Sequence, residues 1–157
     1  MRGTARRSVA RLNAAQALYQ LEMTGTPVDR ALADFITHDM GRQDGEDGDP
    51  IARADARLMS DLVRGAWLRK DELDGMIAAC LAEGWTLERL ELVMRAILRA
   101  GCYEMTQVSE VPAKVIINEY VDLTHAFFAG KEPAFVNAVL DRVARLVRPE
   151  EMGVPPA

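Results

Sequence analysis

Apolar residues recur along most of the chain at the three- and four-residue spacings of amphipathic helices. The first helix is predicted to begin near Thr4 or Ser8, either of which could cap it, and to end at Gly25. A second, short helix should start after Thr26 and Pro27 and end by residue 38 or 40. The side chains expected to face inward from the first helix are Val9, Leu12, Tyr19 and Met23, with Ala14, Leu18 and Leu21 beside them.

The second half of the chain continues the helical pattern. Periodicity resumes at Pro50 and runs to about residue 83, and the charged residues 69–72 predict a kink or tight turn near residue 70. Thr86 could cap the next helix, and Gly101 inside that helix predicts close packing of a neighbour. Pro112 and Pro133 should open the last two helices. The expected inward residues of these two helices are Val115, Ile116, Tyr120, Leu123, Phe127, Val136, Val139, Leu140, Val143 and Val147.

No pair of strands with a hairpin turn is evident, so the predicted fold class is all-α, with six or seven helices in bundle-like packing. The length of 157 residues suits a single domain, residues 1–157. Within it, residues 41–50 hold three glycines, a proline and four acids, which is typical of a flexible acidic surface loop. Residues 148–157 form the expected tail.

The amino-acid composition argues against several classes of protein. Two cysteines and two histidines are too few for a disulfide framework or a structural zinc site. No run approaches the ~20 apolar residues that cross a bilayer, and no secretory signal follows the N-terminal arginines. We therefore expect a soluble, cytoplasmic protein without a membrane segment.

Catalytic and metal-binding motifs are missing from the sequence. Gly130 and Lys131 lack the spacing of a phosphate-binding P-loop, and the acidic run at 44–49 lacks the spacing of an EF-hand. His38 and His125 lie in separate predicted helices and are expected at the surface. The sequence predicts no enzyme, no cofactor and no metal site.

The charge distribution is uneven. The net charge of -5 argues against a protein that coats nucleic acid indiscriminately. Yet Arg2, Arg6, Arg7 and Arg11 precede the first acid, Glu22. Arg7 and Arg11 lie four residues apart on one helix face, and Arg6 points about 100° away from Arg7. Arginines that point in different directions from a helix start, as Arg6, Arg7 and Arg11 do, are suited to binding RNA phosphates. The same pattern is also found in a solvated helix face and in an amphipathic mitochondrial transit peptide.

Four segments carry distinctive motifs in a fixed order. They are residues 5–21 (ARRSVARLNAAQALYQL), residues 98–105 (LRAGCYEM), residues 111–119, which lead from Val-Pro into a helix, and residues 135–141 (FVNAVLD). Together these segments resemble the NusB family of bacterial transcription antitermination factors. Ala138 stands where the family usually has glycine. The resemblance implies a bundle of two packed subdomains that binds boxA RNA of ribosomal RNA leaders together with NusE, a ribosomal protein. It also implies a role beside RNA polymerase and other Nus factors in processive ribosomal RNA transcription.

The resemblance also implies two sets of site residues. For RNA they are Arg6, Arg7 and Arg11, with Gln16 and Tyr19 as rim contacts and Lys131 and Phe135 at the corner 129–135. Tyr19 and Phe135 could instead belong to the core. For NusE they are Glu91, Arg95, Asn118, Glu119 and Asp122, whose helical spacing places Glu91 with Arg95 and Asn118 with Asp122.

Two other classes of protein share parts of this pattern. The same helical domain occurs fused to RNA cytosine methyltransferases, but 157 residues leave no room for the nucleotide-binding sheet of such an enzyme. The second alternative is an interaction scaffold or a homodimer without an RNA role, in which the arginines are only solvated.

Overall fold

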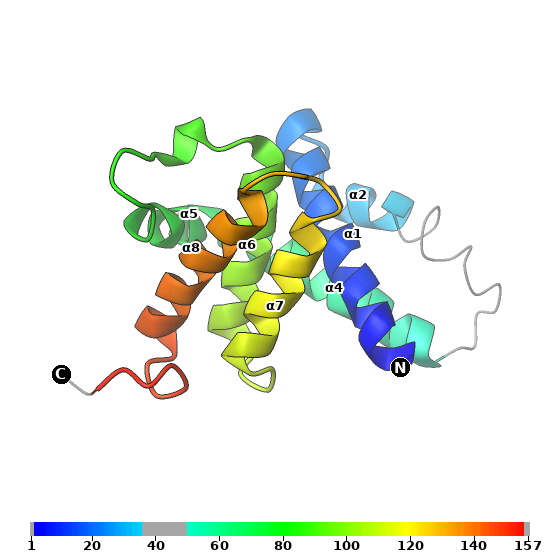
Figure 1. The fold of residues 1–157 in the computed structure, drawn as a ribbon. Coiled ribbons are helices and arrows are strands. Elements are labelled where there is room, and N and C mark those ends of the chain that lie inside the picture. Colours follow the sequence, from blue (N-terminus) through cyan, green and yellow to red (C-terminus); the bar gives the residue numbers. More distant parts are fainter. Residues whose placement is uncertain (1, 36–49, 156–157) are drawn as a thin grey trace.

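The computed structural model describes residues 2–35 and 50–155, and across these two ranges every regular element is a helix. The all-α prediction is thereby confirmed. Figure 1 shows the helices in an arrangement where α6 lies at the centre and packs against α1, α4, α5, α7 and α8. The elements are α1 (Arg2–Thr24), α2 (Val28–Phe35), α4 (Pro50–Leu68), α5 (Lys70–Ala79), the 3₁₀ turn η2 (Leu87–Arg89), α6 (Leu92–Gln107), α7 (Ala113–Thr124) and α8 (Glu132–Val147).

The buried face of α1 differs from the predicted one. Val9 and Met23 are 39% and 56% exposed, so the expectation that they face inward is wrong. The face that packs against α4 and α6 consists mainly of alanines, whose small side chains let neighbouring helices approach closely. Ala14, Leu18 and Leu21, which were predicted beside that stripe, are buried, so this part of the prediction is confirmed. The buried residues of α1 are Ala10, Arg11, Ala14, Ala15, Ala17, Leu18 and Leu21.

Two predicted features of the middle of the chain have different outcomes. The break near residue 70 is confirmed, because α4 ends at Leu68 and α5 begins at Lys70. Thr86, however, precedes only the 3₁₀ turn and makes no capping hydrogen bond with its side chain. Leu90 and Glu91 are extended, with ψ of 139° and 149°, and α6 starts after them. The connection before α6 is therefore an irregular corner rather than part of a helix.

Gly101 has the close neighbour that was predicted. A Cβ atom at this position would lie 3.1 Å from Cδ2 of Leu140 in α8 and 3.4 Å from the Tyr120 ring in α7. Gly65 meets an even closer neighbour, because a Cβ there would overlap the ring of Tyr103. Both glycines allow helices to pack on α6 at short range.

The last two helices begin close to the predicted prolines, with Pro112 as the N-cap of α7 and Pro133 in the first turn of α8. Val115 is 44% exposed, so its predicted inward position is wrong, and Phe127 and Val147 are only half-buried. The other expected inward residues are buried, namely Ile116, Tyr120, Leu123, Val136, Val139, Leu140 and Val143.

Some predictions concern residues outside the described ranges. His38, the end of the second helix and nearly all of the acidic loop at 41–50 belong to this group. None of the described helices combines the length and the apolar character that a bilayer span requires.

Candidate nucleic-acid interface

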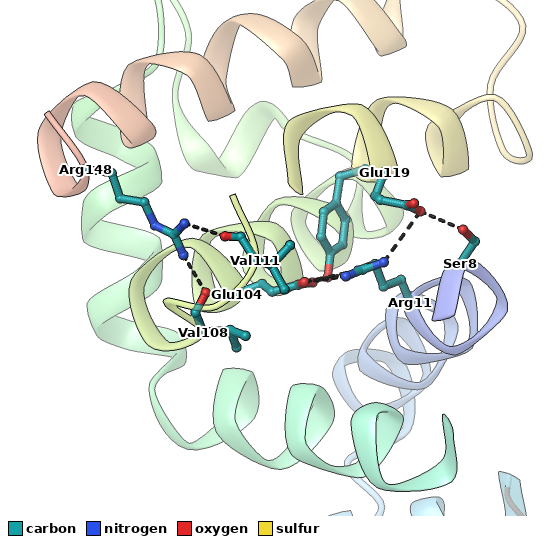
Figure 2. Close-up of polar contacts among 8 residues, drawn as sticks. Ser8, Arg11, Glu104, Val108, Val111, Glu119 and Arg148 are labelled. Carbon is teal, nitrogen blue, oxygen red and sulfur yellow. Dashed lines mark hydrogen bonds and ion pairs between the residues drawn. The ribbon is translucent and has the colours of Figure 1, made fainter. Parts of the chain in front are cut away.

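Arg11 is not part of an exposed basic fork. Its side chain points into the protein, where Nε and Nη2 donate hydrogen bonds of 2.9 and 2.7 Å to the Glu104 carboxylate (Figure 2). Only 3% of Arg11 is exposed. Tyr120 donates a further hydrogen bond to Glu104, with Oη 2.8 Å from Oε1. The prediction that Arg11 presents its guanidinium to phosphate is therefore corrected, because this cation neutralises a buried carboxylate of α6.

The surroundings of Arg11 and Tyr120 keep both side chains protonated. Burial alone would lower the pKa of Arg11, but the hydrogen bonds and charge of Glu104 hold the pKa above its ordinary value. Burial, with the nearby Glu104 charge, raises the pKa of Tyr120 well above its ordinary value, so the phenol keeps its proton. The network consequently holds α1, α6 and α7 together through fully paired polar groups.

Among the arginines at this end of α1 whose side chains the structure describes, Arg7 is exposed and Arg6 is half-buried. The next turn is fixed to α7, because the Ser8 hydroxyl donates a 2.7 Å hydrogen bond to Oε2 of Glu119. Oε2 of Glu119 also lies 3.6 Å from Nη1 of Arg11 (Figure 2). The basic end thus projects from a helix that is anchored directly behind it.

The predicted partner residues divide into two groups. Glu91, Asn118 and Asp122 are exposed, as a docking surface requires. Glu119 is half-buried and already engaged by Ser8 and Arg11, which corrects its assignment to a free surface. Arg95 is half-buried too.

Arg95 turns away from Glu91 despite their four-residue spacing. Its Nε donates a 2.9 Å hydrogen bond to the Leu87 carbonyl, and its Nη1 lies 3.9 Å from a Glu22 oxygen. Arg99, one turn further along α6, pairs with Asp74 of α5 through two hydrogen bonds of 2.7 Å. These contacts tie α6 to the corner before it and to α1 and α5.

Gln16 and Tyr19 are both half-buried. Together with Ser8 and Leu12 they lie on one stripe of α1, and the Ser8 contact places the start of this stripe beside α7. Tyr19 packs against the core with part of its side chain and exposes the rest, so it has features of both predicted alternatives.

Lys131 and Phe135 lie at a pocket of about 220 Å³ at the start of α8. Phe135 is half-buried, and its ring centroid lies 5.5 Å from that of Trp85. Trp85 is 45% exposed, and the Arg89 guanidinium lies over its ring at 5.0 Å. The remaining lining residues are Leu90, Glu91, Met94, Phe128 and Glu132.

The sequence reasoning did not single out Trp85, Arg89 or Glu132 for this pocket. They come from the corner before α6 and from the first residue of α8, which are distant in sequence. In the sequence, the spacing of Trp85 and Arg89 could have indicated that these two side chains lie close together. It could not have indicated that they lie beside Phe135.

The basic end and the pocket do not form one cluster. In Figure 1 the N-terminus of α1 lies at the lower right of the view, and the connection between α7 and α8 lies in its upper part. Helix α1 itself leads from the basic end to the corner before α6, because Glu22 near its C-terminus lies 3.9 Å from Arg95, whose side chain is hydrogen-bonded to Leu87. An extended ligand could therefore contact both, whereas a compact one could not.

A second polar anchor shapes the turn between α6 and α7. Arg148, after α8, donates hydrogen bonds to the carbonyls of Met105, Val108 and Val111, two of which Figure 2 draws. Glu151 accepts a 2.9 Å hydrogen bond from the Ala113 backbone N–H, and this bond lowers the pKa of its carboxyl. Glu151, in the tail predicted at 148–157, thus caps the first N–H of α7.

The described residues hold no group of three or more His, Cys, Asp or Glu side chains placed to bind a metal ion. Cys80 and Cys102 are both buried and free.

The fold and these regions define an all-α protein with an anchored basic helix end and a separate aromatic pocket. Residues 8–145 match the model of the NusB family, and the chain belongs to that family.

Two relatives illustrate the match, and both are described as transcription antitermination protein NusB. The relative from Bradyrhizobium sp. (strain ORS 278) is 42% identical over 148 residues, which cover 94% of this chain and 87% of the relative. The relative from Caulobacter vibrioides is 45% identical over 142 residues, which cover 90% of this chain and 94% of the relative.

Solved structures agree in fold. NusB from T. maritima superposes with a TM-score of 0.74 at 28% identity, covering 94% of this chain and 97% of that one. A structure of NusB and NusE in complex with dsRNA gives a TM-score of 0.73 at 22% identity, covering 90% and 98%. The second comparison supports the fold alone.

Proposed function

We propose that this chain is a non-enzymatic transcription antitermination factor that binds boxA RNA of ribosomal RNA leaders together with the ribosomal protein NusE. In this role it acts beside RNA polymerase and other Nus factors. The observation that carries the proposal is the exposed Arg7 on an acid-free helix end, held in position by the Ser8 to Glu119 hydrogen bond. Guanidinium groups bind phosphate oxygens with two parallel hydrogen bonds, which suits an RNA backbone.

Charge explains why a partner is needed. The chain has a net charge of -5, and each phosphate contact made by a single arginine is weakened by salt. A basic protein docked on the exposed acids Glu91 and Asp122 would add positive charge and contact area next to the RNA. The proposal therefore predicts cooperative binding of RNA and NusE.

The test is a titration of labelled boxA RNA with the chain alone, with NusE alone and with both. The proposal expects the mixture to bind boxA RNA more tightly than either protein, and more tightly than it binds a scrambled RNA of equal length. Asp122→Lys should weaken this cooperativity, and Arg145→Glu on the outer face of α8 is the control for a surface charge change. Equal binding to boxA and scrambled RNA, with or without NusE, would leave a scaffold or homodimer as the better account.

A further inference from the structure

The segment after α8 folds back over the turn between α6 and α7. Arg148 is nearly buried, with 8% of its side chain exposed. Its guanidinium donates hydrogen bonds to three backbone carbonyls, those of Met105 at 2.9 Å, Val108 and Val111. The last carbonyls of a helix have no donor within the helix itself. One cation therefore supplies donors to the end of α6 and to the turn that follows it.

The same segment also holds the other end of this turn. Oε1 of Glu151 accepts a 2.9 Å hydrogen bond from the backbone N–H of Ala113, the first residue of α7. Oε2 of the same carboxylate lies 3.1 Å from Nη1 of Arg148. A negative charge suits this place, because the first N–H groups of a helix have no acceptor within it. Residues 148–154, which we call the C-terminal clasp, thus tie both ends of the α6–α7 turn to one point after α8.

The clasp is a closed turn rather than a loose chain end. The backbone N–H of Val154 donates a 2.9 Å hydrogen bond to the carbonyl of Pro149. Gly153 allows this closure, because its φ of 69° lies in the left-handed region that favours glycine. Met152 packs against the hydrophobic core. These contacts keep the two charged side chains of the clasp beside the turn that they hold.

The helix that the clasp caps also carries predicted partner residues. Asn118 and Asp122 are exposed on α7, and Glu119 beside them accepts the hydrogen bond of Ser8 from α1. In Figure 2 the contacts of Arg148 lie on the left of the view and the Ser8 contact lies on the right. Helix α7 is therefore held at its first residue by the clasp and in its middle by α1.

We propose that the C-terminal clasp fixes α7 in the position that the protein partner recognises, which makes Arg148 a positioning residue for partner binding. The inference rests on the proposed function, since it concerns the partner face of the same complex. Arg148 acts through the backbone that it holds, because its nearly buried side chain leaves little surface for a direct contact. Without the clasp, the start of α7 and the turn before it would open for part of the time. The partner would then bind only the fraction of molecules in which α7 is in place.

The test measures NusE affinity by titration well below the melting temperature, with amide hydrogen exchange of the α6–α7 turn in parallel. Arg148→Ala should speed this exchange and weaken NusE binding roughly fivefold, because apparent affinity falls with the fraction of binding-competent molecules. Arg148→Lys keeps the charge but loses the fork of donors, so its affinity should lie between those of the parent and Arg148→Ala. Arg145→Ala is the matched control, since Arg145 lies on the same helix and pairs with Asp141 at the surface. It should change neither exchange nor affinity.

Glu151→Ala tests the clasp from its other side. Glu151 is exposed, and its loss frees the first N–H of α7 while the three carbonyl contacts of Arg148 stay in place. This variant should therefore fold even if Arg148→Ala does not. We expect faster exchange at the start of α7 and NusE binding that is weakened by about twofold.

The outcomes separate this inference from the proposed function. A merely structural clasp would lower the melting temperatures of the variants and leave NusE affinity of the folded protein at the parental value. That result overturns the inference and leaves the antitermination proposal in place. An equal loss of affinity in Arg145→Ala would assign the effect to surface charge and also overturns the inference. A parent chain that binds neither NusE nor boxA RNA overturns both.

Discussion

The charged side chains of α1 differ in their surroundings, both between its two ends and within its N-terminal end. Near its N-terminus, two arginines four residues apart have opposite environments, because Arg7 is exposed and Arg11 is buried against Glu104. Near its C-terminus, Glu22 faces Arg95 and Arg99 of α6. The α1 charges that pair with α6 hold helices together, whereas Arg7 is exposed. Equal spacing in the sequence does not mean equal function.

The largest effect is expected from breaking the buried pair. Arg11→Ala leaves the carboxylate of Glu104, with an exposed fraction of 0%, without its cation. Removing one partner of such a pair destabilises proteins by about 3–5 kcal/mol. Urea unfolding measures this loss, and Arg7→Ala is the matched control, expected within about 0.5 kcal/mol of the parent. A mild effect at Arg11 would show that water or other groups replace the pair.

A charge reversal separates Glu119 from Asp122. Glu119→Lys removes the acceptor of Ser8 and places a cation beside Arg11, so we expect a loss of about 1–3 kcal/mol. Asp122→Lys at the neighbouring exposed position should leave stability within about 0.5 kcal/mol. Thermal unfolding of both variants measures the difference. Equal stability would mean that Glu119 belongs to the free surface, as its sequence position had indicated.

The sequence could predict the features that depend on neighbouring residues. The break after Leu68 follows from a local run of charge, and the starts of α7 and α8 follow from Pro112 and Pro133. Gly101 was informative because a glycine inside a helix is unfavourable without a packing reason.

The burial of Arg11 could not be predicted in the same way. It depends on Glu104, which is 93 residues away in sequence, and on a phenol from a third helix. The pocket could not be predicted from the sequence either, because Trp85 and Phe135 are brought together only by the packing of the corner before α6 against α8. Among the predicted RNA residues, the local pattern could place Arg7 on the surface, but the position of Arg11 required the tertiary structure.

A smaller effect concerns pH. The raised pKa of Tyr120 means that the unfolded chain releases this proton before the folded chain does. The stability from the protonated phenol is therefore complete below the unfolded pKa of about 10 and is lost as pH rises beyond it. Tyr120→Phe should cost about 1 kcal/mol at neutral pH through the lost hydrogen bond and should reduce the loss at alkaline pH. Parallel unfolding curves at high pH for parent and variant would contradict this assignment.

The most direct measurement of the central claim is the salt dependence of boxA RNA binding by the complex with NusE. The logarithm of the binding constant is plotted against the logarithm of salt concentration for the parent, Arg7→Ala and Arg145→Ala. The account predicts that Arg7→Ala reduces the slope by about one, the value for one lost phosphate contact. Arg145, which is exposed on α8 and paired with Asp141, should leave the slope unchanged. An unchanged slope and affinity in Arg7→Ala would contradict the claim that the basic end of α1 binds RNA.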